Sequence, residues 1–468
     1  MPQRFDLAAK HLYARFREYG VNSDWGRAVY AFHLLIWNQF IEKLPCKNSE
    51  ADFLESFYQI IEATRHAPGP GLHSIIPLAA DRTPLNGAHR IAAALLLGKS
   101  VACVTTEVDP GHIKWDHRFF ERRAELTGFP HQTDIFDAMA LEFCRMLPNI
   151  AIAIKFPAAK GRDEEVDRIL REHATIFYRK AVTLENNGPV HFMRTVYEAE
   201  PWLGSYESDF DGARRKADLC FAHSGPVRFF LLAFDDQAQL TRAKERIRGI
   251  FGIEKHSIHI TDTRHEALRV ARLAFSNPSI GFINTRPLKE MPVFDQLLAR
   301  YREALDGTED SDDFCIDGSA VMAAYGIRDC ADLDYISHGA RELQTGPREP
   351  IGIHNDYAKH YGAKTLDDII FCHRNHFYLS GMKFASLANV RDWKLARGEA
   401  KDQVDVALID VWTAKHMPTK VGLKARATAR RLWFTVIFMR RKMIRSLKES
   451  SLNSVRRGIK KKIRRQRP

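Results

Sequence analysis

The segment from Phe314 to Ile336 constrains the fold of this chain more than any other part of its 468 residues. It reads as a short apolar strand, a Gly-Ser turn, a helix of small residues, and a second strand that carries Asp332 and Asp334. Gly326 stands where that helix would stop. Because side chains two apart on a strand point to the same face, we expect the two carboxylates to lie side by side. The segment therefore predicts a mixed α/β unit.

This order of elements also suits one kind of chemistry. Two carboxylates on one face can hold Mg²⁺, while backbone N–H groups at a helix start receive a phosphate. That layout is typical of metal-assisted nucleotidyl transfer, in which ions clamp the attacking and leaving oxygens. The alternative is a turn and a strand whose acids are incidental.

The pattern Gly318-Ser319, twelve residues, Asp332-Leu-Asp334 resembles that of the DNA-polymerase-β-like nucleotidyltransferase superfamily. The resemblance extends over about 314–412. Its further carriers are Gly326-Ile-Arg328, Trp393-Lys-x-x-Arg397, Lys401-Asp402 and Asp405. It implies that NMP moves from an NTP to an unidentified acceptor, with Mg²⁺ as cofactor. Its pairing with the N-terminal resemblance given below suggests a surface-glycan or small-molecule pathway.

The resemblance also implies roles for single residues. Gly318, Ser319 and Arg328 would bind the nucleotide, and Asp332 and Asp334 would be catalytic and ligate Mg²⁺.

The superfamily takes a third carboxylate from a following strand. Asp368 is our candidate, because it opens the strand-like segment 369–372, and Asp367 and Asp356 are alternatives.

A second resemblance lies near the N-terminus. Asn86-Gly-Ala-His-Arg90 stands between a predicted strand at 74–78 and a helix at 91–97, and a strand is expected at 101–104. Over about 70–130 this resembles the ParB/sulfiredoxin-like domain, which implies that Gly87, His89 and Arg90 bind nucleotide phosphates. Sulfiredoxins have Cys where Ala88 stands, so we do not expect sulfinic-acid reduction. A plain strand, turn and helix is the alternative.

The middle of the chain alternates strands and helices. Strands are predicted at 227–233, 257–260 and 280–283, and helices at 239–250 and 263–275. This order favours a small α/β unit with parallel strands. His259, Asp262 and His265 follow the second strand, where such sheets tend to bind ligands. Capping and packing is our preferred interpretation of these three, since Thr263 and Glu266 have capping-box spacing.

The charge of the chain is unevenly distributed. Residues 420–468 carry 18 Lys and Arg and a single acid, Glu449, whereas the preceding residues have a net charge of −5. Apolar residues from Leu432 to Leu447 fall on one helical stripe, so 424–448 is predicted to bind an anionic membrane surface. Nucleic acid and a protein partner are alternatives, because basic tails also bind these.

These observations predict four regions. They are 1–156 with the N-terminal helices and ParB/sulfiredoxin-like domain, 164–305, 314–412, and the basic helical tail at 420–468. The seven cysteines never stand in C-x-x-C spacing and the first residues are charged, so we expect a cytoplasmic protein, peripheral on the inner face of the membrane. The alternatives to a transferase with small acceptors are a non-catalytic nucleotide-sensing regulator and a nucleic-acid-modifying transferase.

Overall fold

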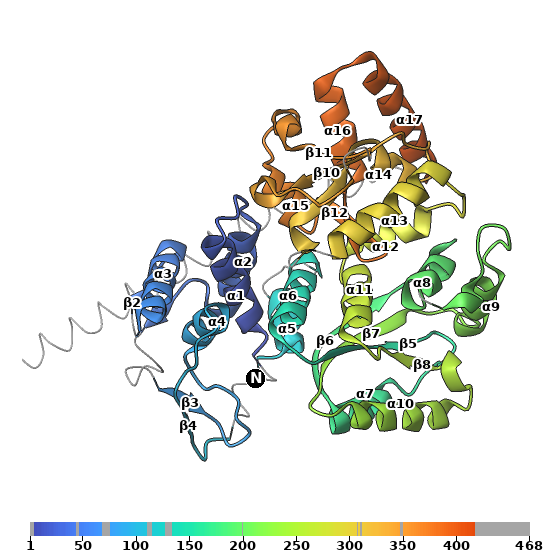
Figure 1. The fold of residues 1–468 in the computed structure, drawn as a ribbon. Coiled ribbons are helices and arrows are strands. Elements are labelled where there is room, and N and C mark those ends of the chain that lie inside the picture. Colours follow the sequence, from blue (N-terminus) through green and yellow to red (C-terminus); the bar gives the residue numbers. More distant parts are fainter. Residues whose placement is uncertain are drawn as a thin grey trace, which may run out of the picture. The chain divides into compact units, whose positions relative to one another are not determined.

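A computed structural model describes residues 4–43, 46–67, 75–109, 115–126, 133–198, 200–306, 308, 311–346 and 350–416 (Figure 1). The chain up to Ile409 forms one compact unit, and the chain from Asp410 belongs to a second. The first unit combines helices with several small sheets, so the predicted mixed α/β class is confirmed. No helix among the described residues is both long and apolar enough to cross a membrane. The predicted amphipathic segment at 424–448 lies outside the described residues.

The N-terminal region is mainly helical. Its elements are α1 (Asp6–Glu18), α2 (Trp25–Asn38), β1 (Glu42–Lys43), β2 (Cys46–Lys47), α3 (Glu50–His66), β3 (Ile76–Leu78), α4 (Ala88–Leu96), β4 (Cys103–Thr105), α5 (His117–Leu126) and α6 (Thr133–Met146). Aromatic residues of the first helices, Tyr13, Tyr30 and Phe57, form a core with the alanines of α4. The predicted strand, helix and strand around Asn86 are confirmed, and β3 pairs with β4 in parallel.

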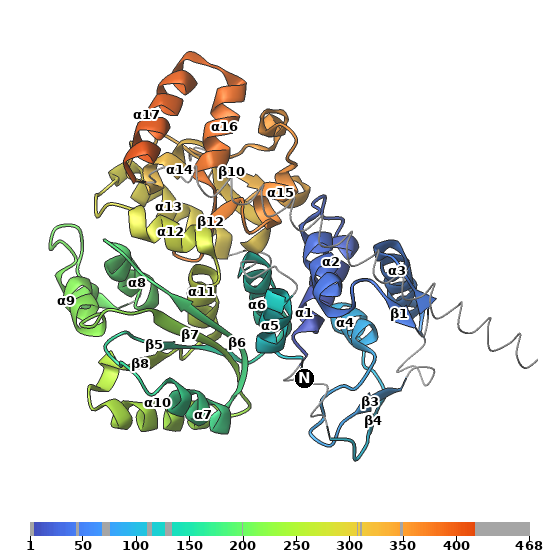
Figure 2. The ribbon, with the colours of Figure 1, turned by 180° about the vertical axis from the view of Figure 1, so that it is seen from behind.

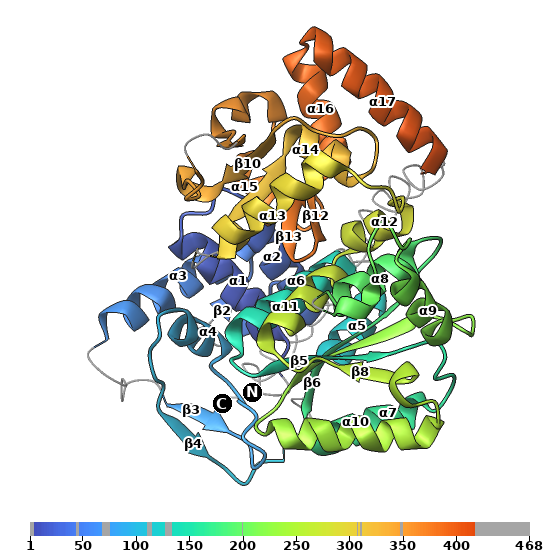
Figure 3. The same ribbon diagram turned by 45° about the vertical axis from the view of Figure 1, so that its right-hand side comes forward.

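The middle region contains a four-stranded sheet. Its elements are β5 (Ile150–Lys155), α7 (Asp163–His173), β6 (Thr175–Val182), α8 (Gly188–Val196), α9 (Asp211–Cys220), β7 (Val227–Ala233), α10 (Gln237–Phe251), β8 (Ile258–Ile260) and α11 (Arg264–Ala274). The strand order is β6-β7-β5-β8, and every neighbouring pair is antiparallel. This is the split βαβ arrangement, in which β7 lies between β5 and β6. The helices α7 and α10 share one face of the sheet, as Figures 1, 2 and 3 show.

Two predictions for this region are wrong. Neighbouring strands are antiparallel, because β7 inserts between β5 and β6 and β8 pairs with the other side of β5. The predicted strands β7 and β8 run in the same direction, but β5 separates them. The apolar run at 280–283 belongs to α12 (Asn277–Thr285), not to a strand. The Ser276 side chain caps that helix by accepting a hydrogen bond from the Ser279 amide, and a short apolar run by itself does not separate a strand from a buried helix.

The C-terminal region holds a five-stranded sheet. Its elements are α13 (Pro292–Asp306), β9 (Phe314–Asp317), α14 (Gly318–Ala324), β10 (Leu333–Ser337), β11 (Ile351–Ile353), α15 (Leu366–Phe371), β12 (His376–Leu379), β13 (Met382–Ala385), α16 (Leu387–Arg397) and α17 (Ala400–His416). The strand order is β11-β10-β9-β13-β12. Helices α12 and α13, which fall in the predicted middle region, contact β12 and β10 of this sheet.

Candidate active site

Three carboxylates meet where β9 and β10 pair. In the antiparallel register Asp334 stands directly opposite Asp317, so their side chains share one face of the sheet. Asp332 precedes Asp334 by two residues and lies toward the same side. The Ser319 hydroxyl donates a hydrogen bond of 3.2 Å to Oδ1 of Asp332. The structure thus brings together Ser319 and the two aspartates that the sequence singles out.

Gly318 lets the backbone approach these carboxylates. Its φ is +64°, in the left-handed region that side chains disfavour, and a Cβ placed there would lie 3.0 Å from Oδ2 of Asp334. The helix α14 begins at this glycine, so its first N–H groups have no partner within the helix. A carboxylate and a helix start therefore lie beside one another at this turn.

Asp317 is the residue that sequence reasoning missed. Its side chain is 1% exposed, and neither carboxylate oxygen makes a hydrogen bond within 3.5 Å among the described residues. The buried hydroxyl of Tyr361 is a polar neighbour: burial, and next the Asp317 charge, raise the pKa of Tyr361. The Nδ1 atom of His354 is 3.8 Å from Asp317 Oδ2 and 3.9 Å from Asp334 Oδ2. The sequence places Asp317 directly before Gly318, at the end of a predicted strand, but only the register of β9 and β10 brings it opposite Asp334.

The three carboxylates repel one another. Burial raises the pKa of Asp334, and the charges of Asp332 and Asp317 raise it further, while His354 and Lys394 oppose the rise. A buried carboxylate without hydrogen bonds is costly unless a cation compensates it. A bound cation would therefore stabilise the carboxylates of this site.

This donor set fits Mg²⁺ in one specific way. Among the described residues no group of three or more His, Cys, Asp and Glu side chains could hold a metal ion by itself. Mg²⁺, however, is commonly bound by one or two carboxylates together with oxygens of a substrate phosphate. Asp332 and Asp334 can supply such carboxylates, and the remaining ligands would come from the substrate.

Arg328, which we expected to contact nucleotide, is engaged in an ion pair. Its Nε and Nη2 atoms donate to Asp405 at 2.7 and 2.6 Å. Lys394 lies 2.8 Å from the same carboxylate and 3.4 Å from Asp402, which Arg397 binds with two hydrogen bonds of 2.7 Å. Arg328, Lys394, Arg397, Asp402 and Asp405 thus form one ion-pair network that joins the loop before β10 to α16 and the start of α17. Lys401 pairs with Glu399 instead.

The third-carboxylate candidates lie elsewhere. The predicted strand at 369–372 is wrong, because Asp368 is part of a capping box with Thr365 that begins α15. Asp368 also accepts a hydrogen bond from the Ser23 hydroxyl, and Asp367 accepts one from the Asn22 amide. Asp356 is exposed in the first turn of a short 3₁₀ helix. The strand that follows the Asp pair, β11, leads instead to His354.

The predicted N-terminal phosphate residues pack against neighbouring side chains. Gly87 has a φ of +80°, and a Cβ there would lie 2.3 Å from Cδ1 of Ile76 and 2.9 Å from Nη2 of Arg90. The Nε2 atom of His89 is 2.7 Å from the Tyr30 hydroxyl, and burial lowers its pKa well below the ordinary value. The imidazole is therefore neutral and directed at α2.

Two of the three residues singled out at the end of β8, His259 and Asp262, have the capping and packing roles that we preferred. The Thr263 hydroxyl accepts a hydrogen bond from the Glu266 amide at the start of α11. Glu266 in turn accepts the Asp262 amide at 2.8 Å and lies 2.7 Å from Nε2 of His259. His265 does not enter this capping group and lines the cavity described below.

Comparisons of the chain with protein-family models, curated proteins and solved structures gave no match.

Proposed function

We propose that this chain is a Mg²⁺-dependent nucleotidyltransferase that moves a nucleoside monophosphate from an NTP to an acceptor. The observation that carries the proposal is the register of β9 and β10, which sets Asp317 against Asp334 beside the glycine that starts α14. Buried negative charge without hydrogen bonds, next to free helix N–H groups, suits a metal-bound triphosphate.

The residues divide the work. Asp332 and Asp334 hold the metal, and the Ser319 hydroxyl orients Asp332. The backbone N–H groups at Gly318 and Ser319 receive phosphate oxygens. Bound Mg²⁺ polarises the phosphoryl oxygens and stabilises the charge that develops on them.

The transfer itself is an in-line displacement. An acceptor oxygen forms a bond to the α-phosphorus, and the bond from that phosphorus to the oxygen bridging to the β-phosphate breaks. Pyrophosphate leaves with the bonding electron pair, and the acceptor's proton passes to solvent. The chain's own contribution is to align the two oxygens and to hold the charge that they share.

Asp317 takes the place that the resemblance reserves for a third carboxylate. It comes from the strand before the Asp pair and not from a following strand, which departs from the superfamily pattern. Its buried oxygens and its position opposite Asp334 support this assignment over Asp368. The imidazole of His354 lies beside both carboxylates, 3.8 Å from Asp317 and 3.9 Å from Asp334, without a hydrogen bond to either.

The test is release of pyrophosphate by the full-length chain. Each of the four NTPs is incubated with Mg²⁺ and a mixture of sugar phosphates, alcohols and nucleic acid as acceptors, and pyrophosphate is measured with and without EDTA. We expect Mg²⁺-dependent release that Asp317→Asn lowers strongly. Release that is insensitive to EDTA or to Asp317→Asn would contradict the proposal.

One observation favours a second candidate, a nucleotide-sensing regulator without transfer activity. His354 stands where the following strand would bring a carboxylate, so the site can hold a nucleotide and still lack a complete catalytic set. Tight NTP binding in the presence of Mg²⁺ without any release of pyrophosphate would support this candidate over the transferase.

A further inference from the structure

A cavity opens at the β8 edge of the four-stranded sheet, away from the carboxylate site. Its volume is about 850 Å³, which falls in the range of small-molecule sites. Helices α8 and α9 and the segment between them line one side, and α10, β8 and α11 line the other. No residue of the five-stranded sheet contributes to its lining.

The lining carries more positive than negative charge. The cations are Arg215, Lys216, Lys244, Arg248, Lys255 and Arg269, and the acids are Glu200, Asp262 and Glu266. Lys244 pairs with Asp262, while Arg248 and Arg269 pair with acids outside the cavity. Among the described residues, Arg215, Lys216 and Lys255 have no acidic partner.

Lys216 is the central feature of this cavity. The residue is 6% exposed, and its Nζ atom donates a 2.8 Å hydrogen bond to the Lys255 carbonyl and lies 3.3 Å from Nδ1 of His256. Burial lowers the pKa of Lys216, and burial together with the nearby Lys216 charge lowers the pKa of His256. A buried ammonium without a carboxylate is costly, and an anion in the cavity would compensate it.

Aromatic side chains adjoin these cations. Trp202 is 42% exposed, and its ring centroid lies 5.2 Å from that of Tyr197. Tyr197 also packs edge-on against His259, and the Nζ atom of Lys216 lies over the Tyr197 ring, 5.5 Å from its centroid. The cavity thus joins unpaired cations to an exposed aromatic face that can stack on a sugar or a planar ring.

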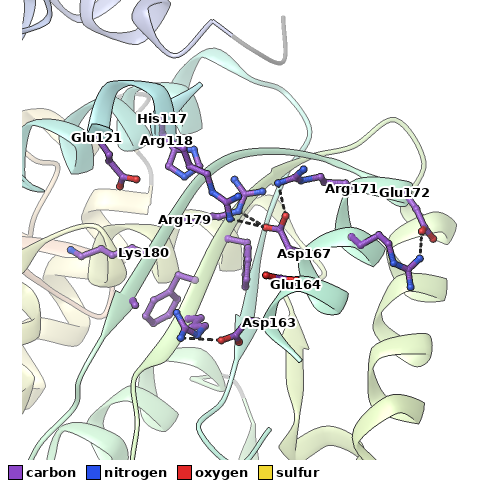
Figure 4. A pocket seen from close by; sticks show the side chains of 15 residues that line it. His117, Arg118, Glu121, Asp163, Glu164, Asp167, Arg171, Glu172, Arg179 and Lys180 are labelled. Carbon is purple, nitrogen blue, oxygen red and sulfur yellow. Dashed lines mark hydrogen bonds and ion pairs between the residues drawn. The ribbon is translucent and has the colours of Figure 1, made fainter. Parts of the chain in front are cut away.

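The opposite edge of the same sheet shows what a charge-balanced cavity looks like (Figure 4). That cavity, of about 730 Å³, is lined by five arginines that pair with acids of the same lining and by Lys180, which pairs with Asp137 outside it. Asp167 alone binds Arg171 and Arg179 and lies 3.5 Å from Arg118, while Asp163 binds Arg228. Of the described cations that line the β8-edge cavity, only Lys244 pairs with an acid of the same lining, Asp262.

We propose that the β8-edge cavity binds a small organic phosphate. Its phosphate contacts Lys216 together with Arg215 and Lys255, and its organic part stacks on Trp202. Both a sugar phosphate and a nucleoside monophosphate present this chemistry, so the experiment has an arm for each. The proposal does not depend on the carboxylate site.

The test is calorimetric titration of the full-length chain with Mg²⁺ chelated, which removes metal-dependent binding at the carboxylates. The probes are inorganic phosphate, glucose 1-phosphate and adenosine monophosphate, with adenosine as the uncharged control. We expect an organic phosphate to bind more tightly than inorganic phosphate, and Lys216→Met to weaken it at least about tenfold. Trp202→Ala should weaken the organic phosphate but not inorganic phosphate.

Arg242→Met is the matched control, because Arg242 lies on α10, is exposed and pairs with Asp236 outside the cavity. It should leave binding unchanged. If Lys216→Met does not fold, Arg215→Ala takes its place, since Arg215 is exposed and unpaired. Failure of all three phosphates to bind, or equal affinity in the wild type and the cavity variants, would overturn the proposal. Pyrophosphate release, measured separately, reports on the carboxylate site alone.

Discussion

The helix starts at Gly87 and Gly318 look alike in sequence and differ in the structure. Each glycine has a positive φ and precedes a helix of small residues, and both were predicted to bind nucleotide. The side chains nearest to Gly87 are those of Ile76 and Arg90, whereas the side chain nearest to Gly318 is the carboxylate of Asp334. A glycine-led helix start is therefore only a potential site, and its surroundings decide what it can bind.

The largest expected effect concerns the C-terminal helix start. Asp332→Asn combined with Asp334→Asn should lower Mg²⁺-dependent pyrophosphate release at least about a thousandfold, which corresponds to about 4 kcal/mol, because the metal loses both carboxylates. Release from the purified variant is compared with wild type after circular dichroism has verified the fold. Asp368→Asn is the control: it should cost about 1 kcal/mol of stability by weakening the α15 cap and leave release intact. Loss of release in Asp368→Asn alone would instead restore that residue to the site.

Exchanging each glycine for alanine separates the two helix starts. Gly87→Ala should lower the free energy of unfolding by about 1–3 kcal/mol, because Ile76 must move and the positive φ is strained. Gly318→Ala should have a smaller effect on stability and a larger one on NTP affinity, because its Cβ meets Asp334.

Urea unfolding and nucleotide titration measure the two effects. Gly98→Ala is the control for backbone strain alone, because Gly98 has a φ of +62° and open space around it. The contrast between the helix starts is lost if Gly87→Ala and Gly318→Ala lower NTP affinity equally.

A smaller effect is expected at the N-terminal helix start. In the background of Asp332→Asn and Asp334→Asn, we expect no residual NTP binding, and Arg90→Ala should then change only stability, by about 1 kcal/mol. Calorimetry of the full-length variants checks this. Residual binding that disappears with Arg90→Ala would show that Gly87, His89 and Arg90 form a phosphate site of their own.

The smallest effect is a dependence of stability on pH and Mg²⁺. The pKa of Asp334 is higher in the folded state than its unfolded value of about 3.8. The folded state therefore loses stability as the pH rises above the unfolded pKa, and the loss is complete once the pH exceeds the folded pKa. Mg²⁺ with a non-hydrolysable NTP should relieve this penalty. We therefore expect the rise in melting temperature on adding both to be larger at pH 7.5 than at pH 4.5, by a few degrees. An equal rise at both pH values would argue against metal binding at Asp334.

The elements with strong local signals were predicted well. The strand, turn and helix from Phe314 to Ala324 follow from an apolar run, a glycine and small residues. The helix α10 follows from its amphipathic pattern, and α11 follows from the capping box that begins at Thr263. Short apolar segments were predicted less well, because whether such a segment forms a strand or a helix depends on the residues that pack over it. The run at 280–283 and the residues after Asp368 are helical in the structure although each could serve as a strand.

Some residues of the candidate site could likewise be found from the sequence, and others could not. Asp332 and Asp334 could be found from the sequence, because a period of two residues places them together whatever the surrounding fold. Asp317 could not, because its partner Asp334 lies seventeen residues away and meets it only through the antiparallel register of β9 and β10. Arg328 was assigned to the nucleotide, yet only the fold shows that Asp405, far along the chain, binds it.

The sequence by itself determined the local units of this protein: the two glycine-led helix starts, the pair of aspartates and the helices with their caps. These depend on contacts within a few residues, which the chain order specifies directly. The tertiary structure decided which side chains surround each helix start, which carboxylate joined the pair, and how the middle strands pair. Those outcomes depend on which distant segments pack together, because burial and long-range pairing, and not local spacing, determine whether a polar group finds a partner.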